Sequence, residues 1–147
     1  MNFPEKDPII THTIQLRSRY SETDKMGYVY YGNFLEYFEV VRTELIRQVG
    51  LPYRKMEENG VMLPVVKAEV EYKRPVKYDE LMDITVFIYD YPSVRLVTYY
   101  EVSTEGQDKP NTFGRVDLTF MDVVSRRPIR APKEFNDGIR NYLMKQT

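Results

Sequence analysis

Apolar residues recur at a helical spacing in one stretch of the chain, within its first third. They stand three or four positions apart, which places their side chains on one face of an α-helix. The residues that share this spacing are Phe34, Phe38, Val41, Leu45 and Val49. Because Leu35, Tyr37 and Ile46 widen the apolar stripe, the pattern predicts a helix over 34–49 that is largely enclosed by the rest of the protein.

Both ends of this helix carry recognisable signals. Asn33 is followed three residues later by Glu36, a spacing similar to a capping box, in which two side chains satisfy the first free N–H groups. Gly50 and Pro52 favour termination, since glycine adopts the left-handed conformation of a helix C-cap and proline cannot continue the helix. We therefore expect Asn33 to cap the start of the helix.

An alternation with period two, typical of half-buried strands, occupies much of the remaining chain. It covers residues 13–20 and then four longer segments, 62–72, 81–91, 94–104 and 112–124. Only short breaks separate these four segments, whereas parallel crossovers need a dozen or more residues. We therefore expect consecutive segments to pair as antiparallel neighbours.

Three shorter segments complete the organisation. Residues 53–60 predict a short helical piece, residues 133–144 predict a terminal helix, and residues 1–10 predict a loose N-terminal arm. The order of one strand, one long helix and four strands predicts an α+β fold in a single domain, 1–147. A sheet with a helix on one face leaves exposed edges, so we also expect an oligomer.

Composition narrows the chemistry. The chain has no cysteine, which excludes disulfides, zinc thiolate sites and a thiol nucleophile, and its single histidine, His12, excludes a multi-histidine metal site. A net charge of −1, from 21 basic and 22 acidic residues, argues against nucleic-acid or membrane partners. No basic leader followed by an apolar run is visible, so we expect a cytoplasmic protein.

One segment carries a recognisable motif, YSETDKMGYVYYGNFLEYFE at 20–39. Its pattern is Tyr-x-x-Thr-Asp-x-x-Gly-x-Val-x-Tyr-x-Asn-Phe-Leu, and weaker matches follow at Leu63-Pro64, Tyr72-x-x-Pro75 and Arg127-Pro128. The segment resembles the signature of hotdog-fold acyl-CoA thioesterases, and is most similar to the 4-hydroxybenzoyl-CoA thioesterase and YbgC-like group. The resemblance implies a hotdog fold, an antiparallel sheet wrapped around one long central helix.

The resemblance also implies an activity, hydrolysis of an acyl-CoA thioester to a free acid and CoA. Asp24 would be the nucleophile or the general base for water, and the backbone N–H of Tyr31 would polarise the thioester carbonyl. Tyr20, Gly32 and Asn33 would contribute to substrate binding. The resemblance implies no metal and no other cofactor, and it implies a homodimer or homotetramer with active sites at the subunit interface.

Physical chemistry supports these roles and leaves alternatives open. Thioester hydrolysis needs a nucleophile or base and donors for the developing oxyanion, and a helix N-terminus offers free N–H groups. Asp24 could instead serve only as a turn-former, Tyr20 could pack on the helix, and Asn33 could act only as a cap. The substrate could be an acyl-carrier-protein or aromatic-CoA thioester, or the protein could bind thioesters without turnover.

The CoA phosphates would require cations, and the sequence offers several without choosing among them. They are Lys73, Arg74, Lys77, Arg126, Arg127 and Arg130.

Overall fold

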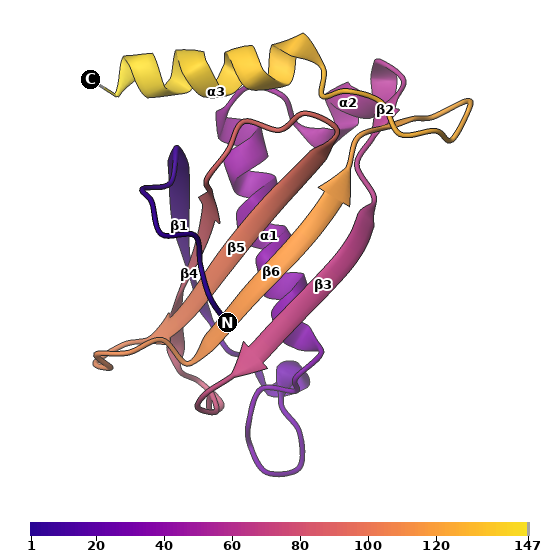
Figure 1. Cartoon of the computed structure of the whole chain (residues 1–147). Helices are drawn as coiled ribbons and strands as arrows, with labels where there is room; N and C mark the ends of the chain where they lie inside the picture. Colours follow the sequence, from indigo (N-terminus) through magenta and orange to yellow (C-terminus); the bar gives the residue numbers. More distant parts are fainter. Residues whose placement is uncertain (147) are drawn as a thin grey trace.

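A five-stranded antiparallel sheet and one long helix form the body of the protein, in a computed structural model that describes residues 1–146 (Figure 1). The elements follow one another as β1 (Ile10–Arg17), a 3₁₀ turn (Tyr20–Glu22), α1 (Asn33–Gln48), α2 (Tyr53–Glu58), β2 (Val61–Met62), β3 (Val65–Tyr72), β4 (Leu81–Ile88), β5 (Arg95–Thr104), β6 (Thr112–Thr119), β7 (Met121–Asp122) and α3 (Lys133–Lys145). The α+β class, with the sheet packed around a central helix, agrees with the prediction from the sequence.

The strand order differs from the expected one at a single connection. The sheet runs β1-β4-β5-β6-β3, so β3 pairs with β6 at one edge and β4 lies three strands away. The prediction that 62–72 and 81–91 would be neighbours is therefore wrong. Eight extended residues span about 26 Å, and three strand spacings need only about 15 Å, so the link 73–80 can cross beneath the sheet without a helix.

Helix α1 packs one face on the sheet and leaves the other open. Phe38 stacks on Tyr100 of β5, with ring centroids 4.4 Å apart and an interplanar angle of 16°. Gly114 of β6 permits this approach, because a Cβ there would lie 2.3 Å from a Phe38 ring carbon. On the opposite face Leu35 and Val40 are 43% and 42% exposed, so in the single chain the helix is not enclosed as expected.

The start of α1 also departs from the prediction. The helix begins at Asn33 itself, Gly32 occupies the capping position, and no side chain caps the first turn. The expected capping box of Asn33 and Glu36 is therefore absent, since the Asn33 side chain bonds elsewhere. At the other end Gly50 adopts a left-handed conformation, φ +89°, as expected for the residue that terminates the helix.

Residues 1–9 lie against the outer face of the sheet, opposite α1, rather than forming a loose arm (Figure 1). Phe3 packs its ring against Phe87, Tyr99 and Phe113 on three adjacent strands, with centroid distances of 4.9 to 5.8 Å. Ile10, placed in the arm by the sequence analysis, is the first residue of β1 and is buried. The cause is apolar burial, which the two nearby prolines do not prevent.

Candidate active site

The loop between β1 and α1 folds back on itself around Asp24. The Asp24 N–H donates to the Tyr28 carbonyl at 2.7 Å, and the Gly27 N–H donates to the Asp24 carbonyl at 3.1 Å. Gly27 has φ +77°, in the left-handed region that glycine adopts without strain. The chain reversal therefore holds residues 24–28 in one closed turn immediately before the helix.

The two carboxylate oxygens of Asp24 have different surroundings. Oδ1 accepts hydrogen bonds from the backbone N–H groups of Met26 at 2.8 Å and Tyr28 at 3.2 Å. Among residues 1–146, Oδ2 has no hydrogen-bond partner. Asp24 is therefore a turn-former through one oxygen, and its second oxygen is available for other chemistry.

Asp24 lies at a cavity of about 320 Å³ between this loop, the first turn of α1 and the end of β3. The walls are largely aromatic and apolar, with side chains from Tyr28, Tyr31, Phe34, Tyr72 and Val76. Val76 reaches the cavity because the crossing link 73–80 pairs with the loop, where the Val29 N–H donates to the Val76 carbonyl at 2.7 Å. The cavity is thus assembled from segments up to fifty residues apart in sequence.

Tyr31 is one of the residues that line this cavity. Its carbonyl accepts a hydrogen bond from the Tyr72 hydroxyl at 2.8 Å, while its N–H has no acceptor among residues 1–146. Burial, aided by the nearby Tyr31, raises the pKa of Tyr72, which keeps this hydroxyl protonated as a donor. On the other side of the peptide bond, the Tyr30 carbonyl accepts from the Asn33 N–H at 2.9 Å. These bonds fix the peptide groups on both sides of Tyr31 and leave its N–H free.

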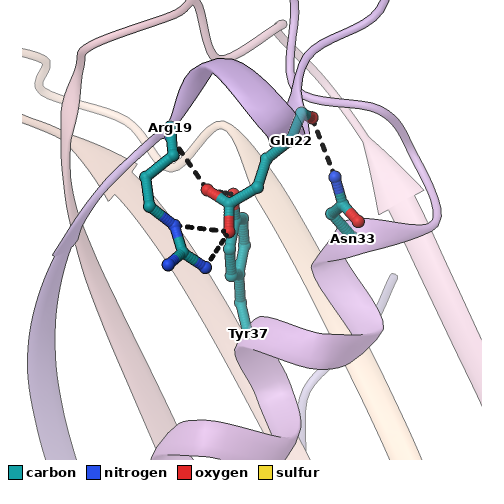
Figure 2. Close-up of polar contacts among 4 residues, drawn as sticks. All are labelled: Arg19, Glu22, Asn33 and Tyr37. Atoms are coloured by element: carbon teal, nitrogen blue, oxygen red, sulfur yellow. Dashed lines mark hydrogen bonds and ion pairs between the residues drawn. The ribbon is translucent and has the colours of Figure 1, made fainter.

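A buried carboxylate, Glu22, ties the loop to α1 (Figure 2). One oxygen accepts from the Tyr37 hydroxyl at 3.0 Å and from the Arg19 backbone N–H at 2.9 Å, and the other accepts from the Arg19 guanidinium at 2.9 Å. The Glu22 carbonyl accepts from the Asn33 side chain and from the Tyr30 N–H, both at 2.8 Å. One residue therefore connects the loop, the residue before Tyr31 and two turns of helix.

The charge state of this cluster follows from its surroundings. Burial favours the neutral form of Glu22, but the hydrogen bonds from Arg19 and Tyr37 outweigh it, so the pKa of Glu22 lies below its ordinary value. Burial and the adjacent Glu22 raise the pKa of Tyr37. At neutral pH the carboxylate is ionised, and the phenol is its neutral donor.

Only some of the site residues expected from the sequence line the cavity at Asp24. Asp24 and Tyr31 line the same cavity. Tyr20 is 80% exposed and packs edge-on against Tyr78 beside a second, neighbouring hollow, which Asp24 also lines. Gly32 and Asn33 do not line either hollow; Asn33 holds the Glu22 carbonyl, as described above.

The structure also places His12, Glu22 and the Tyr72 hydroxyl relative to this cavity. His12 lies 3.4 Å from Gln48 at the C-terminal end of α1, about 22 Å along the helix from its first turn, and so lies far from Asp24. The sequence pattern indicates no role for Glu22 and does not place the Tyr72 hydroxyl. Their partners are 15 and 41 residues away, and no periodicity joins them.

Two of the candidate cations lie at this cavity, Lys73 and Arg74. Lys73 pairs with Glu71, and Arg74 is held by the turn after β5, where it donates to Gln107 at 3.1 Å and to the Lys109 carbonyl. Arg127 and Arg130 lie near β7 at the other end of the sheet. Of the six candidate cations, Lys73 and Arg74 are the two that line this cavity.

Within residues 1–146, no three acidic or histidine side chains gather in a way that could hold a metal ion. No helix of that part of the chain is long and apolar enough to cross a membrane. The residues that line the cavity supply a carboxylate, a backbone N–H without an acceptor among residues 1–146, aromatic rings and two cations.

Comparison with known proteins extends the resemblance over nearly the whole chain. YneP of Bacillus subtilis (strain 168), to which an acyl-CoA thioesterase activity is provisionally assigned, is 41% identical over 87% of this chain and 92% of its own length. The acyl-CoA thioester hydrolase YbgC of Escherichia coli O157:H7 is 29% identical over 80% of this chain and 87% of its own. The crystal structure of a DHNA-CoA thioesterase from Staphylococcus aureus superposes with a TM-score of 0.81 at 32% identity, covering 92% and 91% of the two chains.

The architecture is accordingly that of the hotdog thioesterases, as the motif at 20–39 predicted. The family model of the thioesterase-like superfamily matches residues 18–139, from the end of β1 into α3. With this match and the YneP relationship, the chain belongs to the thioesterase-like superfamily.

Proposed function

We propose that this protein hydrolyses acyl-CoA thioesters to a free acid and CoA. The observation that carries the proposal is that an oxygen of Asp24 and the N–H of Tyr31, both without partners among residues 1–146, belong to residues lining one cavity. A thioester carbonyl accepting from that N–H would lie within reach of Asp24. The names of YneP and YbgC, both acyl-CoA thioester hydrolases by assignment, point to the same reaction.

The chemistry needs only the groups at this site. As a general base, Asp24 takes a proton from water while the water oxygen attacks the thioester carbonyl, and the C–S bond then breaks as CoA leaves with a proton. As a nucleophile, Asp24 attacks the carbonyl, the C–S bond breaks and CoA leaves as its thiolate, which takes up a proton. Water then hydrolyses the acyl–Asp24 anhydride to the free acid and the Asp24 carboxylate. In both routes the Tyr31 N–H donates to the developing oxyanion. This hydrogen bond lowers the barrier most when the donor is already held in position before the reaction.

The phosphates of CoA would bind Lys73 and Arg74 at the edge of the cavity. Arg74 is already ordered by its bonds to Gln107 and Lys109, so little side-chain freedom would be lost on binding. No metal or other cofactor takes part in this proposal. The functional unit would be a homodimer or homotetramer with the cavities at subunit interfaces.

A second candidate substrate class is the aromatic-CoA thioesters. The aromatic cavity walls favour this class. The ring centroid of Tyr72 lies 5.5 Å from that of Phe34 and 6.5 Å from that of Tyr31. Flat acyl groups would stack or pack edge-on against them. The S. aureus structural relative is named for an aromatic substrate, DHNA-CoA.

A panel of thioesters tests the proposal and separates the alternatives. Short and long acyl-CoAs, aroyl-CoAs and acyl-carrier-protein thioesters are each incubated with the protein, and free thiol is measured with a chromogenic reagent. Hydrolysis of at least one CoA thioester with saturation kinetics is expected. Binding of every thioester without thiol release would contradict the enzymatic proposal, and release from carrier-protein substrates alone would reassign the substrate.

A further inference from the structure

A separate cavity lies on the outer face of the sheet, the face opposite α1. It encloses about 300 Å³ between the end of β4, the start of β5, β6 and the N-terminal segment, and it shares no residue with the cavity at Asp24. Pro4 forms part of its wall, held there by the packing of the adjacent Phe3 on the sheet. The cavity is therefore a feature of the folded body rather than of a mobile loop.

Two buried tyrosines line this cavity with unused hydroxyls. Tyr89 and Tyr99 are each 8% exposed, and their rings meet edge to face with centroids 5.4 Å apart. Neither hydroxyl has a hydrogen-bond partner among residues 1–146. The two hydroxyl oxygens are not among the buried unpaired polar atoms of residues 1–146, so both are open to solvent and can donate to a ligand that enters the cavity.

Positive charge lines the same cavity. Arg115 lies over the Tyr99 ring at 5.5 Å, and its Nε and Nη2 bond Asp117 at 2.8 and 3.1 Å, which leaves Nη1 unused. Arg95 has no acidic partner among residues 1–146. The one acidic residue of the lining, Asp90, is paired with Lys6. The cavity is therefore lined by the Arg95 guanidinium, without an acidic partner among residues 1–146, and by two tyrosine rings, over one of which Arg115 lies.

We propose that this outer-face cavity binds a small aromatic carboxylate. Its ring would pack on Tyr89 and Tyr99, and its carboxylate would accept from Arg95 and from the free tyrosine hydroxyls. Guanidinium and carboxylate match in geometry and charge, and the ring contacts supply apolar area. This site is separate from the thioesterase proposal, and each can fail while the other stands.

Isothermal titration of the full chain with benzoate tests the site, with benzamide as the uncharged probe of the same shape. One benzoate per chain is expected, with benzamide at least about tenfold weaker because it lacks the charge that Arg95 pairs. Arg95→Gln and Tyr99→Phe should each weaken benzoate binding, the first by about tenfold. Tyr99→Phe keeps the ring and removes only the hydroxyl, Arg95→Gln keeps a polar side chain without the charge, and circular dichroism checks that the variants fold.

Two matched variants locate the binding. Arg54→Gln removes an exposed arginine on α2, far from both cavities, and should leave benzoate affinity unchanged. Arg74→Gln removes a cation from the Asp24 cavity and should also leave it unchanged. Loss of binding in Arg74→Gln with retention in Arg95→Gln would assign benzoate to the Asp24 cavity and overturn the proposal. Absence of benzoate binding to the wild-type chain would overturn it as well.

Discussion

At the scale of single residues, Asp24 combines two roles through its two oxygens. Asn can keep the turn, because its amide oxygen can still accept from Met26 and Tyr28, but it cannot take a proton from water or attack a carbonyl. We expect Asp24→Asn to lower kcat by about 10² or more with an unchanged melting temperature. Steady-state thiol release and thermal denaturation measure the two quantities.

A second aspartate in the chain provides a matched control. Asp122 also accepts two backbone hydrogen bonds in its own turn, from Val124 at 3.1 Å and Ser125 at 2.7 Å, at the far end of the sheet from Asp24. Asp122→Asn should leave the rate of thiol release unchanged. If Asp24→Asn retained more than about a tenth of the wild-type rate, the assignment of Asp24 as base or nucleophile would be wrong.

Tyr31 is expected to act through its backbone rather than its phenol. The side chain is 63% exposed, and the N–H is the group without a partner among residues 1–146. Tyr31→Phe should keep most of kcat. Tyr31→Pro removes the N–H, and loss of one oxyanion donor should lower kcat by about 10²–10³.

Comparison of kcat in the two Tyr31 variants distinguishes a role of the phenol from a role of the backbone N–H. Equal loss of kcat in both would show that the phenol takes part in the chemistry. A folded, active Tyr31→Pro variant would place the oxyanion donor elsewhere, most simply at the first amides of α1. Circular dichroism of the proline variant separates loss of chemistry from loss of fold, since proline also restricts Tyr30.

At the scale of elements, Glu22 joins the loop to α1, and this tie depends on pH. Because its folded pKa is below the unfolded value, ionised Glu22 stabilises the fold above about pH 4.5, and this stabilisation is lost as pH falls through the lowered folded pKa. Glu22→Gln should therefore reduce the free energy of unfolding at pH 7 by about 1.5–3 kcal/mol, the range for hydrogen bonds to a charged group. The difference from wild type should shrink toward zero at acidic pH.

Urea denaturation between pH 7 and pH 3 measures this difference. Glu36→Gln is the control, since Glu36 is an exposed acid in the first turn of the same helix and its side chain makes no hydrogen bond within residues 1–146. If the loss in free energy of unfolding in Glu22→Gln stayed constant down to pH 3, the charge of the Glu22 carboxylate would not contribute to holding the loop on α1. A reduced kcat in Glu22→Gln would show that the hydrogen bonds of Glu22 also position the Tyr31 N–H.

At the scale of the whole molecule, two surfaces of the chain remain open. Strand β3 is an edge strand that leaves Val65 and Val66 51% and 46% exposed, and α1 exposes Leu35 and Val40. Unpaired strand edges and grouped apolar side chains favour association. We expect light scattering coupled to size exclusion, at micromolar concentration, to give a dimer or tetramer mass. A single species of 17.5 kDa would contradict the proposed interface sites.

Much of the fold was predictable because it depends on local pattern. The apolar spacing from Phe34 to Leu45 located α1 to within a residue, since a helix needs one continuous apolar face. The alternating segments located the strands, although Leu63-Pro64 divides the expected 62–72 strand into β2 and β3. Proline cannot donate to a ladder, which explains the interruption.

The pairing partners were less predictable because they depend on distant residues. The eight residues of the link 73–80 could close a hairpin or cross the sheet, and the pairing of Tyr72 with Thr112 decides for the crossing. The same pairing brings the end of β3 to Tyr31. The position of the Tyr72 hydroxyl is a consequence of this topology, not of any motif.

The sequence by itself determined the elements, the α+β class and the segment that carries Asp24, because these follow from period, turn residues and a motif read along the chain. Only the tertiary structure decided that Oδ1 of Asp24 is used by its turn, that Asn33 holds Glu22 instead of capping α1, and that residues 1–9 pack on the sheet. Each of these is a contact between groups whose separation in space is set by the fold. Hydrogen-bond partners and buried surfaces are chosen by that separation, so a one-dimensional pattern leaves them open.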